Sequence, residues 1–317
     1  MLIQQFEDKN LAHFSYAILS DCENKIILID PSRNPEQYLN FAKDHKATIV
    51  GVIETHPHAD FTSSHLELHQ KVGATIYASK LVNAHYPHQT FDEGDEIRLG
   101  KIRLTPLNTP GHSPDSISIL LEHEEKPKAI FTGDTLFIGD YGRPDLREGA
   151  GNIQATRNEL AKQMYHSLRD KLAKLPDNAT VYPAHGAGTL CGKALSSAQS
   201  STIGAEKMTN WSMQDMTEAD FVEDLLADQP FIPAYFPYNV ELNRSGLPGF
   251  EESISKVIIG ETIKDEKDAN HLNQERWIID ARDEKTFKQG HLLKSINLME
   301  GTKFETWLGS IIKPNEK

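Results

Sequence analysis

The sequence predicts a layered α/β (α+β) fold, and three observations support this. Short runs rich in β-branched and aromatic residues recur along the first part of the chain, most of them separated by turn residues. Between them lie a few amphipathic segments with helical spacing. Clusters of His and Asp follow several of the apolar runs, and loops at strand ends are where layered α/β folds gather functional residues.

The elements follow in order from these patterns. Strands are predicted at residues 14–19, 25–29, 49–53, 74–78, 96–99, 102–107, 116–121, 129–132 and 180–182, and helices at 35–45, 63–72 and 156–175. In the last helix Leu160, Met164, Leu168 and Leu172 recur on one face, and Pro176 ends the pattern.

Composition excludes several classes of function. The formal net charge of -13 opposes binding to nucleic-acid phosphates, and no basic cluster offsets it locally. No apolar run approaches the length of a membrane span, and the N-terminus lacks a secretory signal pattern. The two cysteines fit a reducing compartment. We therefore expect a soluble, cytoplasmic protein that binds neither nucleic acid nor membrane.

The length of 317 residues suggests more than one domain. We expect a catalytic domain over residues 1–205. The sequence then becomes rich in Met and Pro, which predicts a linker with helical segments over 206–250. A strand candidate at 277–280 begins a further unit within 251–317, but too few residues remain for an independent core.

A first group of metal-ligand residues follows the predicted strand 49–53. His56, His58 and Asp60 alternate along an extended stretch, so their side chains can point toward one locus. The alternative is a polar loop that caps the next helix. Three further strand-end loops carry His112, Asp134 and His185. Each alone has an ordinary structural explanation, but their order and setting together favour a metal site.

These loops resemble the ordered signature of the metallo-β-lactamase superfamily, over about residues 1 to 200. The resemblance implies an αββα sandwich with metal bound at the strand-end edge. One position departs from it: Phe61 stands where the superfamily's dinuclear zinc hydrolases have a histidine that helps to bind a second metal. Phenylalanine offers no lone pair, so we expect one metal.

Two imidazoles and one carboxylate are the ligand set of non-haem Fe(II) oxygenases. Residues 133–146 and 182–193 narrow the resemblance to bacterial persulfide dioxygenases fused to sulfurtransferase domains. That resemblance implies one Fe(II) per chain, with zinc as an alternative in purified protein. The implied ligands and catalytic residues are His56, His112 and Asp134. His58, Asp60 and His185 would surround them.

The same resemblance suggests contacts to the substrate. They involve Arg143, Tyr182, Cys191 and Lys193. For Arg143 the alternative is a structural salt bridge with Asp145, and for Cys191 it is a small buried hydrophobic role.

The tail resembles the first half of a rhodanese domain, in the run 277–282 and at Gly290, His291 and 295–298. Rhodanese catalysis needs a later cysteine, and none follows Cys191, so the tail cannot transfer sulfur by that route. Either a longer protein has been truncated or the domain has decayed. We expect the tail to form an interaction surface and the protein to be a homo-oligomer.

The resemblance therefore implies an enzyme that oxidises glutathione persulfide, or another low-molecular-weight thiol persulfide, with O2 to sulfite and free thiol, a reaction of sulfide detoxification. The main alternative is a zinc-dependent thioester hydrolase of the glyoxalase II type. A non-catalytic sulfur-trafficking or scaffold protein is a third possibility, which the incomplete tail favours and the intact metal loops oppose.

Overall fold

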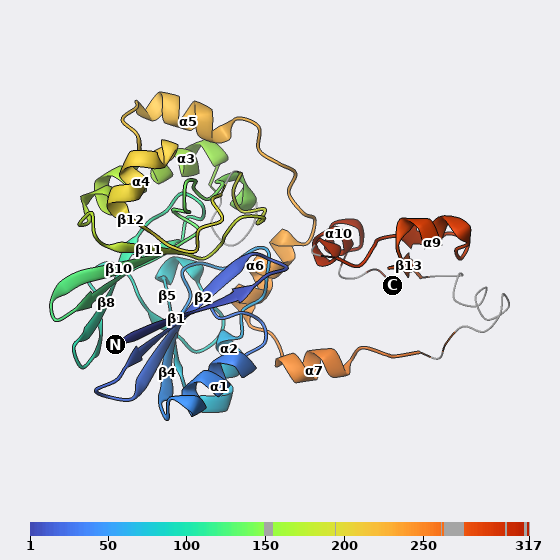
Figure 1. Ribbon diagram of the computed structural model, residues 1–317, viewed down its shortest axis with the longest axis horizontal. Coiled ribbons are helices and arrows are strands. Elements are labelled where there is room, and N and C mark those ends of the chain that lie inside the picture. Colours follow the sequence, from blue (N-terminus) through green and yellow to red (C-terminus); the bar gives the residue numbers. More distant parts are fainter. Residues whose placement is uncertain are drawn as a thin grey trace.

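The structure is a computed structural model that describes residues 1–148, 155–193, 195–260, 262, 276–301, 303–313 and 316. Two six-stranded sheets stack face to face, and helices cover both outer faces (Figure 1). The predicted α/β fold and its αββα sandwich are therefore confirmed.

The first sheet has the strand order β1-β2-β3-β4-β5-β6. Its strands are β1 (Leu2–Asp8), β2 (His13–Ser20), β3 (Lys25–Ile29), β4 (Thr48–Ile53), β5 (Thr75–Ala78) and β6 (Gln89–Thr90). The first three are antiparallel, and β3 to β6 run parallel. Helices α1 (Glu36–Asp44) and α2 (His65–Val72) pack Tyr38 and Leu68 onto its outer face.

The second sheet has the order β12-β11-β10-β9-β8-β7. Its strands are β7 (Ile97–Leu99), β8 (Ile102–Asn108), β9 (Ile117–His123), β10 (Lys126–Gly133), β11 (Thr180–Pro183) and β12 (Ser201–Thr202). The helix predicted over 156–175 begins with a capping box at Thr156 as α3 (Arg157–His166). It continues as a π turn (Ser167–Lys171) and a 3-10 turn (Leu172–Lys174) where one regular helix was expected.

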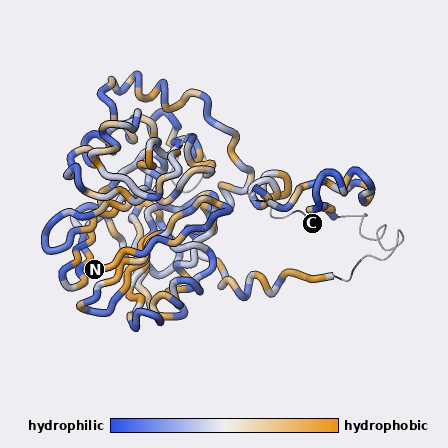
Figure 2. The backbone as a smooth tube through the Cα atoms, in the orientation of Figure 1, coloured by the Kyte–Doolittle hydropathy of each residue, from blue (hydrophilic) through white to orange (hydrophobic). Residues whose placement is uncertain are grey.

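The main core lies between the two sheets. Apolar residues of β2, β3 and β4 face those of β8, β9 and β10, for example Ile27 and Ile53 against Leu104 and Leu121. In Figure 2 these strands form the largest hydrophobic region of the tube. The alternation of apolar and polar residues in β8 explains why this strand could be read from the sequence.

Residues 206–250 contain several helices that pack on the sandwich, and their role as a linker stays a prediction. Their helices are α5 (Glu218–Leu226), α6 (Phe236–Ser245) and the start of α7 (Phe250–Ser255), after α4 (Ile203–Thr209). Phe221 packs against the outer face of the second sheet, and Phe236 packs near Ala59. The boundary expected at residue 205 therefore falls inside packed structure.

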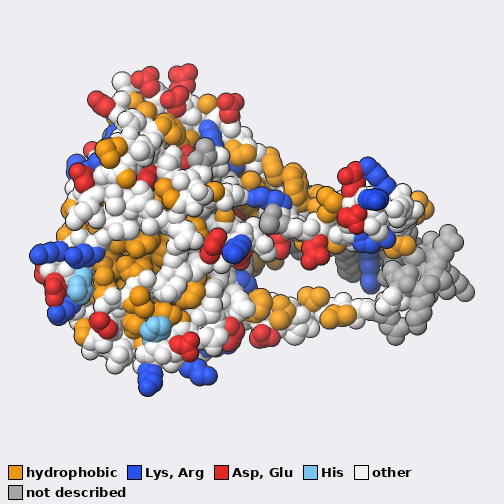
Figure 3. Space-filling view, in the orientation of Figure 1, with side chains coloured by type: hydrophobic (Ala, Val, Ile, Leu, Met, Phe, Trp, Pro, Cys, Tyr) orange, Lys and Arg blue, Asp and Glu red, His pale blue; other side chains and the backbone are white. Residues whose placement is uncertain are grey.

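Short 3-10 turns at Lys80–Val82, Asp145–Arg147 and Trp211–Met213 complete the body. The tail contains β13 (Ile279–Asp280), α9 (Glu284–Gln289), β14 (Ile296–Asn297) and α10 (Phe304–Ile311), with β13 parallel to β14. Helix α10 lies against the body, and the part with β13 and α9 projects outward beyond it (Figures 1 and 3). These few elements do not establish a rhodanese fold, so the rhodanese resemblance stays a prediction. None of the helices in the described ranges is both long and apolar enough to cross a bilayer.

Replacing Phe221 tests whether residues 206–250 belong to the core. The ring is fully buried, so Phe221→Ala should lower the free energy of unfolding in urea by about 3 to 5 kcal/mol. The control is Met208→Ala on α4, where the side chain is 77% exposed and the expected change is below about 0.5 kcal/mol. Equal stabilities for the two variants would restore the linker interpretation.

Candidate metal centre

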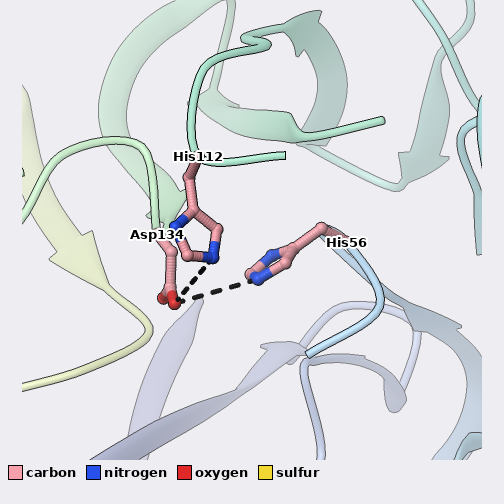
Figure 4. Close-up of side chains that lie close together, drawn as sticks. All are labelled: His56, His112 and Asp134. Carbon is pink, nitrogen blue, oxygen red and sulfur yellow. Dashed lines mark ion pairs between the residues drawn. The ribbon is translucent and has the colours of Figure 1, made fainter. Parts of the chain in front are cut away.

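Three side chains from separate loops point toward one another at the strand-end edge of the sandwich (Figure 4). His56 follows β4 of the first sheet, whereas His112 follows β8 and Asp134 follows β10 of the second. The Oδ2 atom of Asp134 lies 3.8 Å from Nε2 of His56 and 3.6 Å from Nε2 of His112. All three residues are buried. The structure therefore brings the three predicted ligands together.

The donor atoms of this group fit a metal ion. Nε2 of His56 and Oδ2 of Asp134 are buried and make no hydrogen bond. The opposite nitrogens are held: Nδ1 of His112 lies 2.8 Å from the Arg143 carbonyl oxygen, and Nδ1 of His56 lies 3.1 Å from the Thr55 hydroxyl. Metal-binding histidines are usually oriented by such a bond on the other nitrogen. Buried donors without partners are costly unless something binds them.

The shifted pKa values of His56, His112 and Asp134 favour the protonation states that bind a cation. Burial lowers the pKa of His56 and of His112, which favours the neutral imidazole that binds metals. Burial would raise the pKa of Asp134, but the nearby histidines hold it well below its ordinary value. The group thus offers two neutral nitrogens and one negative oxygen.

His185 connects the carboxylates of Asp134 and Asp60. Its Nδ1 lies 2.7 Å from Oδ1 of Asp134, and its Nε2 lies 2.8 Å from Oδ2 of Asp60. Burial alone would lower the pKa of His185, but the two carboxylates raise it well above its ordinary value. Asp134 thus uses one oxygen for His185 and turns the other toward His56 and His112.

Phe61 fills the space beside a second group of possible donors, which consists of His58, Asp60 and His185. The ring is 4% exposed and lies 3.9 Å from the ring centroid of His13 and 4.5 Å from that of His58. Donor atoms of His58, Asp60 and His185 still lie within 4.8 Å of one another. The Phe61 ring therefore places carbon next to these three donors, where a further nitrogen donor would be needed for a second metal.

His58 faces a carboxylate that the sequence reading overlooked. Neither of its ring nitrogens makes a hydrogen bond, and Nε2 lies 3.4 Å from Oδ1 of Asp30. The same carboxylate accepts hydrogen bonds from the backbone N–H of Thr55 at 2.7 Å and from its hydroxyl at 2.8 Å. Asp30 follows β3 just as the other site residues follow their strands. This position directly after a strand was the sequence signal that could have identified Asp30.

Gly142 allows the next loop to approach the site. A Cβ atom at this position would lie 1.8 Å from the carbonyl oxygen of Asp134 and 2.9 Å from Nδ1 of His112. Any larger residue would have to displace the backbone that carries a predicted ligand.

Arg143 has the contacts of the salt-bridge alternative. It is fully buried and pairs with Asp145 through Nε at 2.8 Å and Nη2 at 2.6 Å. Its remaining guanidinium N–H groups point to the carbonyl oxygens of Leu190, Pro230 and Phe231. All five donors of the side chain thus have partners, and none remains for a substrate carboxylate.

Two other predicted substrate contacts also lie in structural settings. The ring of Tyr182 stacks on Phe131 at 5.3 Å and packs against the core between the sheets. Lys193 donates to the carbonyl oxygens of Leu225 and Ala227 at the end of α5. These contacts are structural, so the predicted role of Tyr182 and Lys193 in substrate binding stays a prediction.

Cys191 lies closer to the candidate metal centre. It is 1% exposed, and its sulfur lies within 4.8 Å of donor atoms of Asp134 and His185. Burial raises the pKa of the Cys191 thiol well above its ordinary value. Cys191 is therefore both a small buried side chain and a neighbour of the candidate metal centre.

Asn243 of α6 supports the histidine loop and was missed by the sequence reading. Its Nδ2 donates to the carbonyl oxygens of His58 at 2.8 Å and Phe61 at 2.7 Å, and its Oδ1 accepts from the backbone N–H of Ser63 at 2.8 Å. No local pattern could reveal these bonds, because the partners lie about 180 residues apart.

A second missed support is a buried pair beside His112. Arg147 donates to both carboxylate oxygens of Asp115, at 3.2 and 3.0 Å, and to the hydroxyl of Ser113. Ser113 follows His112 directly, so this pair fixes the backbone next to a predicted ligand.

Removal of the Asn243 amide should weaken the fold through the histidine loop. Asn243→Ala leaves three buried backbone groups without partners, which should lower the free energy of unfolding by about 1 to 3 kcal/mol in a urea titration. Asn239→Ala on the same helix is the matched control and should change it by less than about 0.5 kcal/mol. A similar loss in both variants would mean that the effect comes from α6 in general.

Comparisons with known proteins extend these observations. The sequence profile of the metallo-beta-lactamase superfamily matches residues 10–185. Persulfide dioxygenase ETHE1 of Mus musculus is 31% identical over 188 residues, which cover 58% of this chain and 68% of that protein. The cytoplasmic hydroxyacylglutathione hydrolase of Arabidopsis thaliana is 32% identical over 176 residues, 55% of this chain and 63% of that protein.

A solved structure is similar over nearly the whole chain. The crystal structure of a metallo-beta-lactamase from Staphylococcus aureus aligns with a TM-score of 0.83 and 32% identity. The alignment covers 98% of this chain and 88% of that chain.

Proposed function

This chain belongs to the metallo-beta-lactamase superfamily, and we propose that it acts as an iron-dependent persulfide dioxygenase. In the proposed reaction a low-molecular-weight thiol persulfide such as glutathione persulfide, O2 and water give sulfite and the free thiol. A persulfide dioxygenase and a hydroxyacylglutathione hydrolase are similar to this chain at nearly equal identity. The choice between the two reactions therefore depends on the site.

The observation that carries the proposal is Phe61. Two imidazoles and one carboxylate form one complete group at His56, His112 and Asp134. Beside it the second group lacks a donor where Phe61 is packed, and His185 is engaged by a carboxylate on each nitrogen. A single metal with open positions is the typical arrangement for non-haem iron chemistry.

The three ligands would hold Fe(II) through Nε2 of His56, Nε2 of His112 and Oδ2 of Asp134. Nε2 of His56 and Oδ2 of Asp134 are buried and have no hydrogen-bond partner. A bound Fe(II) would bring O2 and the outer sulfur of the persulfide together and mediate electron transfer between them, with the sulfur as the net electron donor. The chain's own contribution is mainly orientation. His185 keeps Oδ1 of Asp134 in a hydrogen bond, so that Oδ2 remains directed toward His56 and His112.

The remaining polar groups would shape the reaction space. His58 and Asp60 each have a buried atom without a hydrogen bond, so they can accept or donate to a bound reactant. Cys191 brings a sulfur atom beside Asp134, where it can contact the persulfide. Its position inside an apolar cluster would help to keep water away.

One observation favours the zinc-dependent thioester hydrolase as a second candidate. The donors of His58, Asp60 and His185 cluster beside the first group, and such a cluster suits a second metal. In that reaction a bound water would attack the carbonyl carbon of an acyl-glutathione thioester. The two candidates differ in metal content and in O2 consumption.

Metal analysis coupled to O2 uptake tests the proposed function. We expect about one iron per chain and O2 consumption that depends on glutathione persulfide. His112→Ala removes one of the three ligands and should abolish both iron and uptake. Cys191→Ser is the control, because it lies beside the group without completing it, and should retain iron.

Three outcomes would contradict this assignment. Two zinc ions per chain with thioester hydrolysis and no O2 uptake would favour the hydrolase. Retained iron in His112→Ala would show that the ligand set is wrong. Loss of iron in Cys191→Ser would make the thiol a ligand.

Substitution of Phe61 tests why one metal is expected. Phe61→His adds a nitrogen donor beside Asp60 and His185, so zinc-reconstituted protein should rise from about one to about two metal ions per chain. Phe61→Leu, which offers no lone pair, is the control and should stay at about one. A metal content of one in Phe61→His would remove the explanation based on this residue.

A further inference from the structure

A narrow pocket leads from the surface to Asp60. The ten residues that line it come from the N-terminal turn, the loop after β4, the loop before Cys191, the start of α6 and the tail: Asn10, Leu11, Asp60, Gly188, Thr189, Leu190, Tyr235, Phe236, Lys303 and Thr306. Oδ1 of Asp60 is buried and has no hydrogen-bond partner, whereas Oδ2 bonds to His185. The inner end of the pocket therefore adjoins the candidate metal centre.

Helix α10 of the tail forms the outer wall of this pocket. The ring of Trp307 stacks on Phe231 with centroids 5.4 Å apart and planes at 20°. Gly309 lies so near Tyr235 that a Cβ atom there would be 2.6 Å from the ring. Figure 1 shows α10 next to α6, where these contacts occur. The tail is thus seated on the segment that borders the site.

Lys303 is the one basic residue among the ten that line the pocket. Its ammonium group donates a hydrogen bond across the mouth to the carbonyl oxygen of Gly188. An ammonium group carries three N–H donors, so this bond leaves others for a ligand. The cavity volume is only about 10 Å³, roughly the space of one water, so a ligand must widen the mouth to enter.

We propose that Lys303 binds the carboxylate of the thiol persulfide at this mouth and makes the enzyme selective for anionic thiols. A carboxylate is a stronger hydrogen-bond acceptor than the carbonyl oxygen of Gly188. The carboxylate of a ligand can therefore take the place of this carbonyl oxygen at Lys303 and open the pocket. The formal net charge of -13 repels an anionic ligand at long range, so a cation at the mouth would favour its binding. This inference rests on the proposed function, because it assigns the substrate class of the same site.

Steady-state O2 uptake by the iron-loaded full chain tests the assignment with two substrates. Glutathione persulfide is anionic and the persulfide of 2-mercaptoethanol carries no carboxylate. Lys303→Met should raise the KM for glutathione persulfide about fivefold to tenfold and leave the KM for the persulfide without a carboxylate unchanged. The value of kcat should stay the same in both cases. Lys303→Arg keeps the charge and should retain most of the selectivity.

Two further variants separate the ammonium group from the tail as a whole. Lys313→Met removes a lysine of the same tail that does not line the pocket, and it should behave as wild type. Gly309→Val places a side chain against Tyr235 and should displace α10. It should reduce the preference for the anionic persulfide although Lys303 is present.

Calorimetric binding of glutathione separates this inference from the proposed function, because binding needs no turnover. A wild-type protein without O2 uptake would refute the dioxygenase, yet weaker glutathione binding by Lys303→Met would still support the anion site. An unchanged KM and unchanged glutathione binding in Lys303→Met would overturn the inference. An equal rise in KM for both persulfides would overturn it as well.

Discussion

The buried carboxylate of Asp134 is the group on which the arrangement of the site depends. A charge removed from water is tolerated only when partners compensate for it. Asp134 meets this requirement with two loops of the second sheet and one of the first, through His112, His185 and His56. The Asp134 carboxylate therefore links loops at the strand ends of both sheets and helps to hold these ends together at one edge of the sandwich.

The sequence was sufficient for what local patterns determine. Period-two alternation and turn residues located most strands, and the spacing of Leu160 and Met164 located α3. Strand-end clusters then identified His56, His112 and Asp134 and the group His58, Asp60 and His185, but not Asp30, which faces His58. The edge strand β1 was missed, because its half-buried residues lack a clear apolar face. The widened turn after α3 was missed as well, since the apolar spacing continues through it.

What could not be predicted depends on contacts between distant segments. Asn243 supports the histidine loop from α6, and Arg143 is saturated by carbonyl groups of residues 190, 230 and 231. Neither contact leaves a mark in the surrounding sequence. Composition also gave no sign that the short helices of residues 206–250 pack on the sandwich, where Phe221 and Phe236 are core residues.

The support from α6 changes what counts as the smallest working unit of this protein. The superfamily profile ends at His185, the last residue of the two groups of candidate donors. A fragment that ends there would contain all three predicted ligands but would lack α6. It would lose Phe236 and the side-chain amide of Asn243, which holds the loop from His58 to Ser63. Transplanting this centre into another scaffold, or expressing it alone, therefore requires the chain through the end of α6 at Ser245.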